Sequence, residues 1–416
     1  MPESGEPPDV GPVNDPYGVL KNRDFLLYLI SRFIASFAQQ MLAVTVGWEI
    51  YERTQSTLAL GYVGMVQMIP MFLFIFPAGH VADNYNRKAV MVWMQVMYGI
   101  ACVGLTVVST MAAPVVWMYA ALFLMGVART YMWPASASFM PQLVPRSQFA
   151  KAVTWNSGSF QISAVAGPVA GGLLVGLTHN AWWVYGLNVV ASIACIVLLL
   201  LVKTHHKVLS PEKMSFASVI AGLKFVYRTK IVLGSITLDL FAVLLGGATA
   251  LLPVYAKDIL KVDAKGLGWL QAALPLGSLL MSLILVHRPP LQRAGRTLLW
   301  SVAGFGLATI AFGYSRWFWL SFALLFVCGL TDYISVVVRH TLVQLLTPDE
   351  MRGRVSAVNS LFIGTSNQMG EFESGLVSHL TNPLFAVVSG GIGTLLVVGA
   401  VALLWPEIRK YGRLDA

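Results

Sequence analysis

Six charged side chains stand inside long apolar stretches of the sequence. Two are arginines and four are carboxylic acids: Arg32, Arg129, Asp239, Asp332, Glu371 and Glu373. A charge surrounded by hydrocarbon is costly, so it marks either a buried ion pair or the path of an ion or polar solute. Carboxyl groups also exchange protons. We therefore predict that these residues line a cavity and couple proton movement to it, and that none of them is catalytic.

Four of these charges correspond to one another in position. Asp239 follows Arg32 by 207 residues, and Asp332 follows Arg129 by 203. We expect an arginine from the first half to pair with an aspartate from the second, closing one end of the cavity until an aspartate is protonated. The alternative is a static pair within one half. Arg339 lies seven residues after Asp332 on the same helix face and is a competing partner.

Glu371 and Glu373 lie two residues apart, which places them roughly 200° apart around a helix. At most one of them faces the cavity, and the other must bond to a neighbouring helix or to water. Proton carriage and structural hydrogen bonding both remain open for these two residues. Glu49, beside Trp48, is expected at the membrane interface.

The elements that must position these charges are membrane-spanning helices. Of 416 residues, 56% are hydrophobic and only 11% are charged, against about 25% charged in soluble domains. Helical runs of ~20 apolar residues cross a bilayer core, and lipid requires that backbone polar groups bond within the segment. We predict an all-α membrane protein with twelve spans, at 25–50, 58–82, 89–110, 113–138, 153–177, 181–202, 231–256, 266–287, 296–314, 318–340, 355–377 and 382–405.

The cations are distributed unevenly between alternate loops. Twenty of the 28 Lys and Arg residues fall in loops on the same side as the termini, and five fall on the other side. The positive-inside rule then predicts a multi-pass protein of the cell (inner or plasma) membrane with both termini in the cytoplasm. The net charge of +9 is explained by this distribution, so no nucleic-acid partner is expected.

The second half of the chain repeats the first. At an offset of 203, Pro145 corresponds to Pro348, Asn156 to Asn359, and Gly172 to Gly375. Parallel six-span repeats are a transporter architecture in which two halves alternate in access around a central site. The sequence predicts five segments. They are a disordered cytosolic tail (1–22), a six-helix half (23–202), a cytoplasmic linker with a possible amphipathic helix (203–230), a second six-helix half (231–405) and a cytosolic tail (406–416).

A short polar turn between the second and third spans carries Gly79, Asp83, Arg87 and Lys88. This pattern resembles the loop signature of the major facilitator superfamily, with Asn86 in place of a glycine. Asn also adopts the left-handed turn that glycine favours. The resemblance implies that the acid and the arginine latch the two halves together on the cytoplasmic side. The alternative is an ordinary solvated, positively charged loop.

Two further stretches resemble branches of this superfamily. Gly167, Pro168, Gly171 and Gly172 match the core of a helix-bending motif of drug–proton antiporters, although generic helix packing also explains them. The stretch 347–355 and the Gly370–Gly375 segment resemble the branch that contains bacterial enterobactin exporters. This implies proton-driven efflux of a hydrophobic, amphipathic or siderophore-like small molecule across the bacterial inner membrane.

Other functions remain as alternatives. An importer, a facilitator or a lipid flippase would have the same architecture, and a non-transporting scaffold or sensor could retain the fold. The chain has no phosphate-binding loop and no catalytic grouping, so an enzyme is not expected. The three cysteines are far apart, which predicts no metal site and no cofactor. Expected partners are a small-molecule substrate, protons and the lipid bilayer, and one chain contains the whole pathway, so we expect a functional monomer.

Overall fold

The computed structural model describes residues 17–203, 216–288 and 292–412, and this part of the chain is helical. Most of the first expected tail, the middle of the linker and the last four residues lie outside the described residues. Twelve long helices account for the bulk of the fold: α1 Arg23–Thr54, α2 Thr57–Asn84, α3 Arg87–Thr110, α4 Val116–Leu143, α5 Phe149–Thr178, α6 Trp182–Leu201, α8 Lys230–Leu245, α10 Ala264–Val286, α11 Ala294–Tyr314, α12 Phe318–Leu346, α13 Asp349–Leu380 and α14 Pro383–Leu404.

Ten helical segments in the described ranges are long and apolar enough to cross a membrane. The two long helices outside this group are α4 and α13, which carry Arg129 and the pair Glu371 and Glu373. Their lower hydropathy follows from these polar residues. Helices of this kind face a protein interior or an aqueous path rather than lipid.

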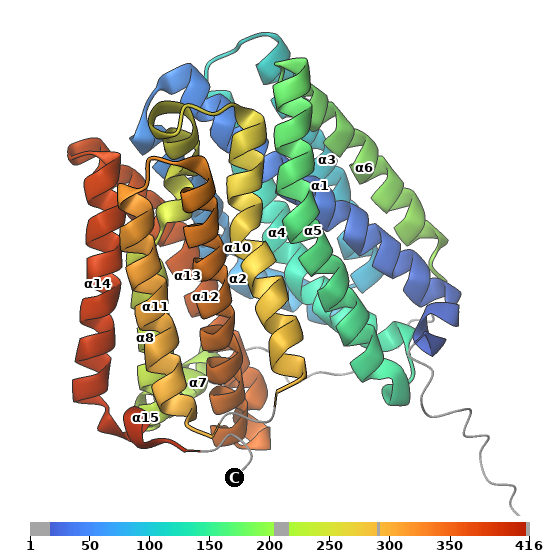
Figure 1. Cartoon of the computed structure of the whole chain (residues 1–416). Helices are drawn as coiled ribbons and strands as arrows, with labels where there is room; N and C mark the ends of the chain where they lie inside the picture. The colour runs from blue at the N-terminus through green and yellow to red at the C-terminus, as the bar shows by residue number, and fades with distance from the viewer. Residues whose placement is uncertain (1–16, 204–215, 289–291, 413–416) are drawn as a thin grey trace, which may run out of the picture.

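The helices form two bundles, α1–α6 and α8–α14 (Figure 1). Within the first bundle α1 packs against α5 and α6, and α4 packs against α2 and α3. Within the second, α12 packs against α10 and α11, and α14 packs against α8 and α11. Two extensive contacts join the bundles, α2 against α13 and α5 against α10.

The two bundles meet at one end of the molecule and diverge at the other (Figure 1). We call the end where α1 begins and α14 ends the terminal end, and the opposite one the far end. Near the far end Tyr51 on α1 donates a hydrogen bond to Asp258 of the second bundle. Midway along α5, Gln161 Nε2 donates to the Pro275 carbonyl oxygen of α10 at 3.0 Å. From there toward the terminal end α5 and α10 separate (Figure 1).

Glycines permit the close contacts at the far end. A Cβ added to Gly375 of α13 would lie 2.7 Å from Gly61 Cα of α2, and one added to Gly172 of α5 would lie 2.9 Å from Gly268 Cα of α10. These separations leave no room for a side chain on either helix. Small residues of this kind let membrane helices pack backbone to backbone.

The seventh expected span is interrupted. After α8 the chain passes through Gly246 and Gly247 into a 3-10 turn (Ala248–Leu251), the short helix α9 (Leu252–Val254) and a π-helical turn (Tyr255–Ile259). A Cβ on Gly247 would lie 2.5 Å from the Gly370 carbonyl oxygen of α13. The break therefore occurs where α8 approaches α13 too closely for a side chain.

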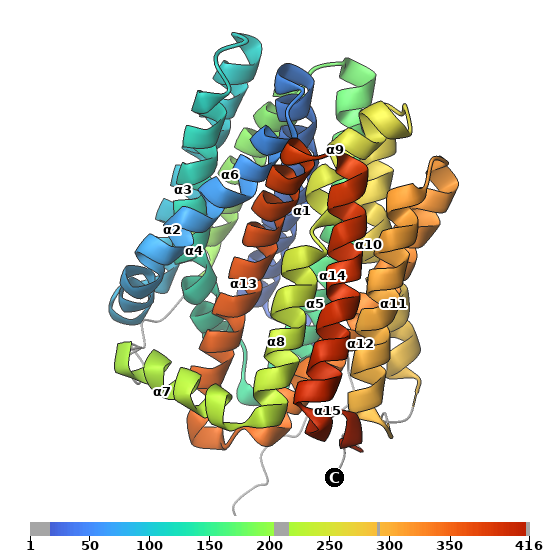
Figure 2. The same cartoon turned by 90° about the vertical axis from the view of Figure 1, so that its left-hand side faces the viewer.

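Short elements lie at the terminal end. Residues 18–21, assigned to a tail from the sequence, form a 3-10 turn in which Val19 is buried. The second expected tail includes α15 (Pro406–Lys410), in which Ile408 is buried. Helix α7 (Phe216–Arg228) occupies the part of the linker where an amphipathic helix is expected, and it lies across the ends of the long helices beside α13 and α8 (Figure 2).

Candidate functional site

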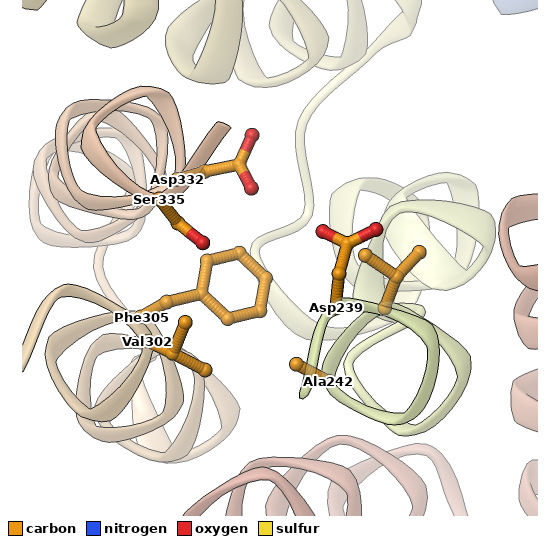
Figure 3. Close-up of a pocket in the computed structure, with 7 residues that line it drawn as sticks. Asp239, Ala242, Val302, Phe305, Asp332 and Ser335 are labelled. Carbon is orange, nitrogen blue, oxygen red and sulfur yellow. The ribbon is translucent and has the colours of Figure 1, made fainter. Parts of the chain in front are cut away.

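A small pocket within the second bundle is bordered by two acidic residues. Asp239 on α8 and Asp332 on α12 line it together with Phe305 of α11 and Ser335 of α12. Figure 3 shows both carboxylates pointing toward a shared space beside the Phe305 ring. The space has room for about one water molecule. It is therefore large enough to hold a water molecule between the two acids but too small for a cargo molecule.

Asp239 forms a buried ion pair with Arg339 of α12. Their side chains are only 10% and 3% exposed, so each charge depends on the other for stabilisation. In this conformation the partner of Asp239 is Arg339, which was expected beside Asp332, and the described ranges hold no salt bridge between Asp239 and Arg32. The two residues of the pair lie on α8 and α12 of the same bundle.

The two arginines of the first bundle have different surroundings. Arg32 Nε on α1 is buried, and no hydrogen-bond partner for it lies among the described residues. Arg129 on α4 is exposed. Within the described ranges Arg129 has no salt bridge with Asp332. The expected pairing of Arg129 with Asp332 across the bundles is therefore not seen in this conformation.

Glu371 lies at the contact between α13 and α2, near the far end. A Cβ added to Gly64 of α2 would lie 2.8 Å from Glu371 Oε2 and 2.7 Å from the Gln368 carbonyl oxygen. On the same helix Gln368 Oε1 and Thr365 Oγ1 are buried, and neither finds a hydrogen-bond partner in the described part of the chain. Glu373 instead accepts a hydrogen bond from Ser374 Oγ at 3.4 Å. The two glutamates therefore have separate environments, and Glu371 is the one in the interface between the bundles.

The polar turn 79–88 is bound to its own bundle. Arg87 donates to the carbonyl oxygens of Ala82 and Ser138 at 3.3 and 3.2 Å, and Lys88 Nζ donates to those of Leu200 and Val202, both at 2.8 Å. These bonds tie the start of α3 to the ends of α2, α4 and α6.

The two remaining motif residues differ from expectation. Asp83 has no salt bridge among the residues described, so its expected latch to the start of the eleventh span (α13) is not seen in this conformation. Asn86 does not adopt a left-handed turn. Its φ is −61°, and its side chain accepts a hydrogen bond from Ala89 N and caps α3. Asparagine favours this capping position because its oxygen satisfies a free N–H of the first helical turn.

The glycines of the α5 motif serve two different contacts. A Cβ on Gly167 would lie 2.5 Å from Gln40 Cβ, and one on Gly171 would lie 2.7 Å from the Met41 carbonyl oxygen, both on α1. Gly172 faces α10, and Pro168 O lies 2.5 Å from the Cβ position of Gly268. The motif thus lets α5 pack against its own bundle on one side and against the second bundle on the other.

Glu49 was expected at the membrane interface, but it lies in a buried hydrogen-bond network that the sequence did not predict. Glu49 is 5% exposed. It forms a 2.5 Å ion pair with Arg53, and it accepts hydrogen bonds from Tyr185 at 2.6 Å and Ser109 at 2.8 Å. The four-residue spacing of Glu49 and Arg53 is the one local signal from which this ion pair could have been predicted. The tyrosine and the serine lie on α6 and α3, and no local pattern identifies them.

Comparison with known proteins agrees with this architecture. The sequence profile of the Major Facilitator Superfamily matches residues 28–369. The chain belongs to the major facilitator superfamily. It is therefore a multi-pass membrane protein of a family of secondary transporters for small molecules, not of enzymes.

The chain is similar to enterobactin exporters over most of its length. It is 25% identical over 391 residues to the enterobactin exporter EntS of Escherichia coli O1:K1, covering 93% of both chains, and the same values hold for EntS of Shigella boydii serotype 18.

Solved structures share the fold at lower identity. The nucleoside transporter NupG superposes with a TM-score of 0.72 at 12% identity, over 92% of this chain and 100% of the other. A bacterial homologue of the iron transporter ferroportin in an inward-facing state gives 0.72 at 16%, over 94% and 99% of the two chains. A bacterial homologue of the lysosomal transporter Spinster, inward-facing and occupied, gives 0.71 at 14%, over 95% and 97%. At these identities the likeness establishes the fold alone.

Proposed function

We propose that this superfamily member exports a hydrophobic, amphipathic or siderophore-like small molecule in exchange for protons. The observation that carries the proposal is the position of Glu371, whose carboxyl group is packed at the contact between α2 and α13. These two helices must separate if the far end opens. Glu371 is half-buried at this contact, and burying an ionised carboxylate is more costly than burying the protonated acid. Closing the far end around Glu371 is therefore linked to proton binding there.

The arrangement of charges supports a cycle of exchange. With the far end open, Glu371 takes a proton from that side, and the α2–α13 contact then closes. The terminal end diverges in the closed form (Figure 1), so a proton that leaves Glu371 in this form is released toward the terminal side. Cargo binding to the deprotonated protein then favours the return.

The Asp239–Arg339 pair and Asp332 have a second role in this proposal. Asp239 is already neutralised by Arg339, which disfavours it as the proton carrier. Asp332 shares the small pocket with Asp239 but is free of a salt bridge within the described ranges. It is the second candidate for carrying a proton, and its exchange would pass through the water-sized space beside Asp239.

Sidedness and cargo are part of the same proposal. The distribution of loop cations supports a cytoplasmic location for the terminal end under the positive-inside rule, and in this proposal the described conformation opens inward. The similarity to enterobactin exporters across 93% of both chains supports export of a siderophore or a molecule of comparable size. A monomer is sufficient, because both bundles and the interface between them belong to one chain.

Transport in proteoliposomes under an imposed pH gradient tests the proposal. The probes are iron-free enterobactin and a panel of lipophilic cations, with internal pH recorded by a trapped dye. We expect cargo-dependent proton movement in the parent protein, its loss in Glu371→Gln and its retention in the matched control Glu373→Gln. Loss in Asp332→Asn with normal coupling in Glu371→Gln would transfer the carrier role to Asp332. Cargo flux without proton movement in the parent protein would refute antiport.

A further inference from the structure

Helix α7 packs against the second bundle through one narrow face. Val226 is 3% exposed and belongs to an apolar cluster with Val232 and Ile236 of α8 and Val358 of α13. A Cβ on Gly222 would lie 2.8 Å from the Arg354 carbonyl oxygen of α13. At about 100° per residue, these two α7 residues lie on the same side of the helix. The helix therefore packs closely on the bundle through this side, and its opposite side is directed away from the bundle.

The opposite side combines bulky apolar residues with cations. Ile220, Leu223 and Tyr227 are 52%, 47% and 76% exposed, and at three- and four-residue spacings they form one stripe. Lys224 and Arg228 are exposed along the edge of that stripe. In a soluble protein such a stripe would be unfavourable. An apolar stripe flanked by cations is typical of helices that lie in the bilayer interface.

The height of α7 on the molecule matches the headgroup region. Its contacts are with residues in the first three turns of α8 and α13, and it runs across the ends of the spanning helices (Figure 2). The ends of spanning helices are the level at which the hydrocarbon core gives way to lipid headgroups. At this level the apolar stripe is expected to contact the acyl chains, and the cations are expected to contact the lipid headgroups.

The cations of this face are free to bind a ligand. Neither Lys224 nor Arg228 has a salt bridge within the described ranges, whereas the neighbouring Lys230 is paired with Glu407 of α15 at 3.0 Å. An unpaired lysine and an arginine one turn apart suit a phosphate group. A second copy of the same face would bring like charges together, which disfavours self-association here.

We propose that α7 is a binding site for anionic phospholipid, with Ile220, Leu223 and Tyr227 against the acyl chains and Lys224 and Arg228 on the headgroup phosphate. This site is separate from the transport pathway and does not depend on proton coupling. It would anchor the connection between the two bundles to the membrane surface. Each cation near an anionic surface strengthens lipid association about fivefold at low salt.

The test uses the full chain carrying Tyr227→Cys labelled with bimane. The native Cys102, Cys195 and Cys328 are buried and unpaired, so labelling is directed to position 227. The protein is reconstituted in mixed phosphatidylcholine and phosphatidylglycerol vesicles, with bromine quencher on one lipid or the other at matched content. We expect stronger quenching by brominated phosphatidylglycerol, and equal quenching by both lipids when Lys224→Gln and Arg228→Gln are added.

The control is Lys230→Gln, which removes a neighbouring cation that Glu407 already occupies, and it should keep the preference for phosphatidylglycerol. Equal quenching by the two lipids in the parent protein would overturn the proposal. So would quenching by aqueous iodide at the rate of free dye, since the face would then be in water. A third result would also overturn the proposal: bimane emission that changes with the protein-to-lipid ratio but is quenched by neither brominated lipid. Such a result would indicate contact between protein copies at this face.

Discussion

Replacing Gly64 by alanine should open the far end of the transporter. The added methyl would lie 2.7 Å from the Gln368 carbonyl oxygen and 2.8 Å from Glu371 Cβ, while carbon contacts are comfortable at about 3.5–4.0 Å. Glu371 can rotate its carboxylate away, but the Gln368 carbonyl belongs to the α13 backbone. Helices α2 and α13 must therefore move apart by roughly 0.7–1.2 Å, or the closed contact must be abandoned.

The cost of this overpacking sets the size of the effect. Inserting one methylene into a packed contact costs about 1–3 kcal/mol. At 1.4 kcal/mol for each factor of ten, the ratio of closed to open far end falls by about 5- to 150-fold. Because the strain exists only in the closed contact, the substitution changes the conformational equilibrium more than the stability of either bundle.

Two pairs of spin labels measure this shift. Cysteines at Met111 and Trp317, both exposed at the far end, should move apart, and cysteines at Tyr85 and Gln344, both exposed at the terminal end, should approach. The matched control is Gly104→Ala on α3, where an added Cβ meets nothing within 4 Å. Distance distributions in Gly64→Ala that equal those in the control would refute the argument that Gly64 holds the far end closed.

Three further outcomes are expected. Asp239→Ala should lower the free energy of unfolding by about 3–5 kcal/mol, because it leaves the buried charge of Arg339 without its partner. Thermal unfolding in detergent measures this loss, and the stability should recover when both residues are replaced by leucine. Glu49→Gln should cost about 1.5–3 kcal/mol in the same assay through its charged hydrogen bonds, with proton coupling intact in the molecules that remain folded. Tyr51→Phe removes the hydrogen bond to Asp258 that joins the bundles. The distribution of distances between the two far-end labels should shift to longer values while the protein remains folded. An unchanged distribution would show that this bond does not contribute to closure.

Spacing along the chain predicts which charged residues correspond to one another. Corresponding positions in the repeat predict that Arg32 matches Asp239 in depth and that Arg129 matches Asp332, because each helix rises by a constant ~1.5 Å per residue. The depth of a residue in the membrane does not determine which neighbouring helix its side chain faces. In the folded protein Asp239 pairs with Arg339 within its own bundle, and no salt bridge joins Arg129 to Asp332 in the described ranges. Which helix a charge faces depends on the rotation of each helix about its axis, and that follows from packing.

The sequence by itself determined the long helices, their grouping by repeat and the family. Apolar length and the bilayer thickness dictate spanning helices, and the polar turn at 79–88 identified the superfamily that the profile over residues 28–369 confirmed. Only the tertiary structure decided that Gly172 serves the contact between bundles while Gly167 and Gly171 serve α1, that Glu371 lies between α2 and α13, and that Glu49 is buried beside Tyr185. These contacts join residues far apart in sequence, and close packing of whole helices selects them.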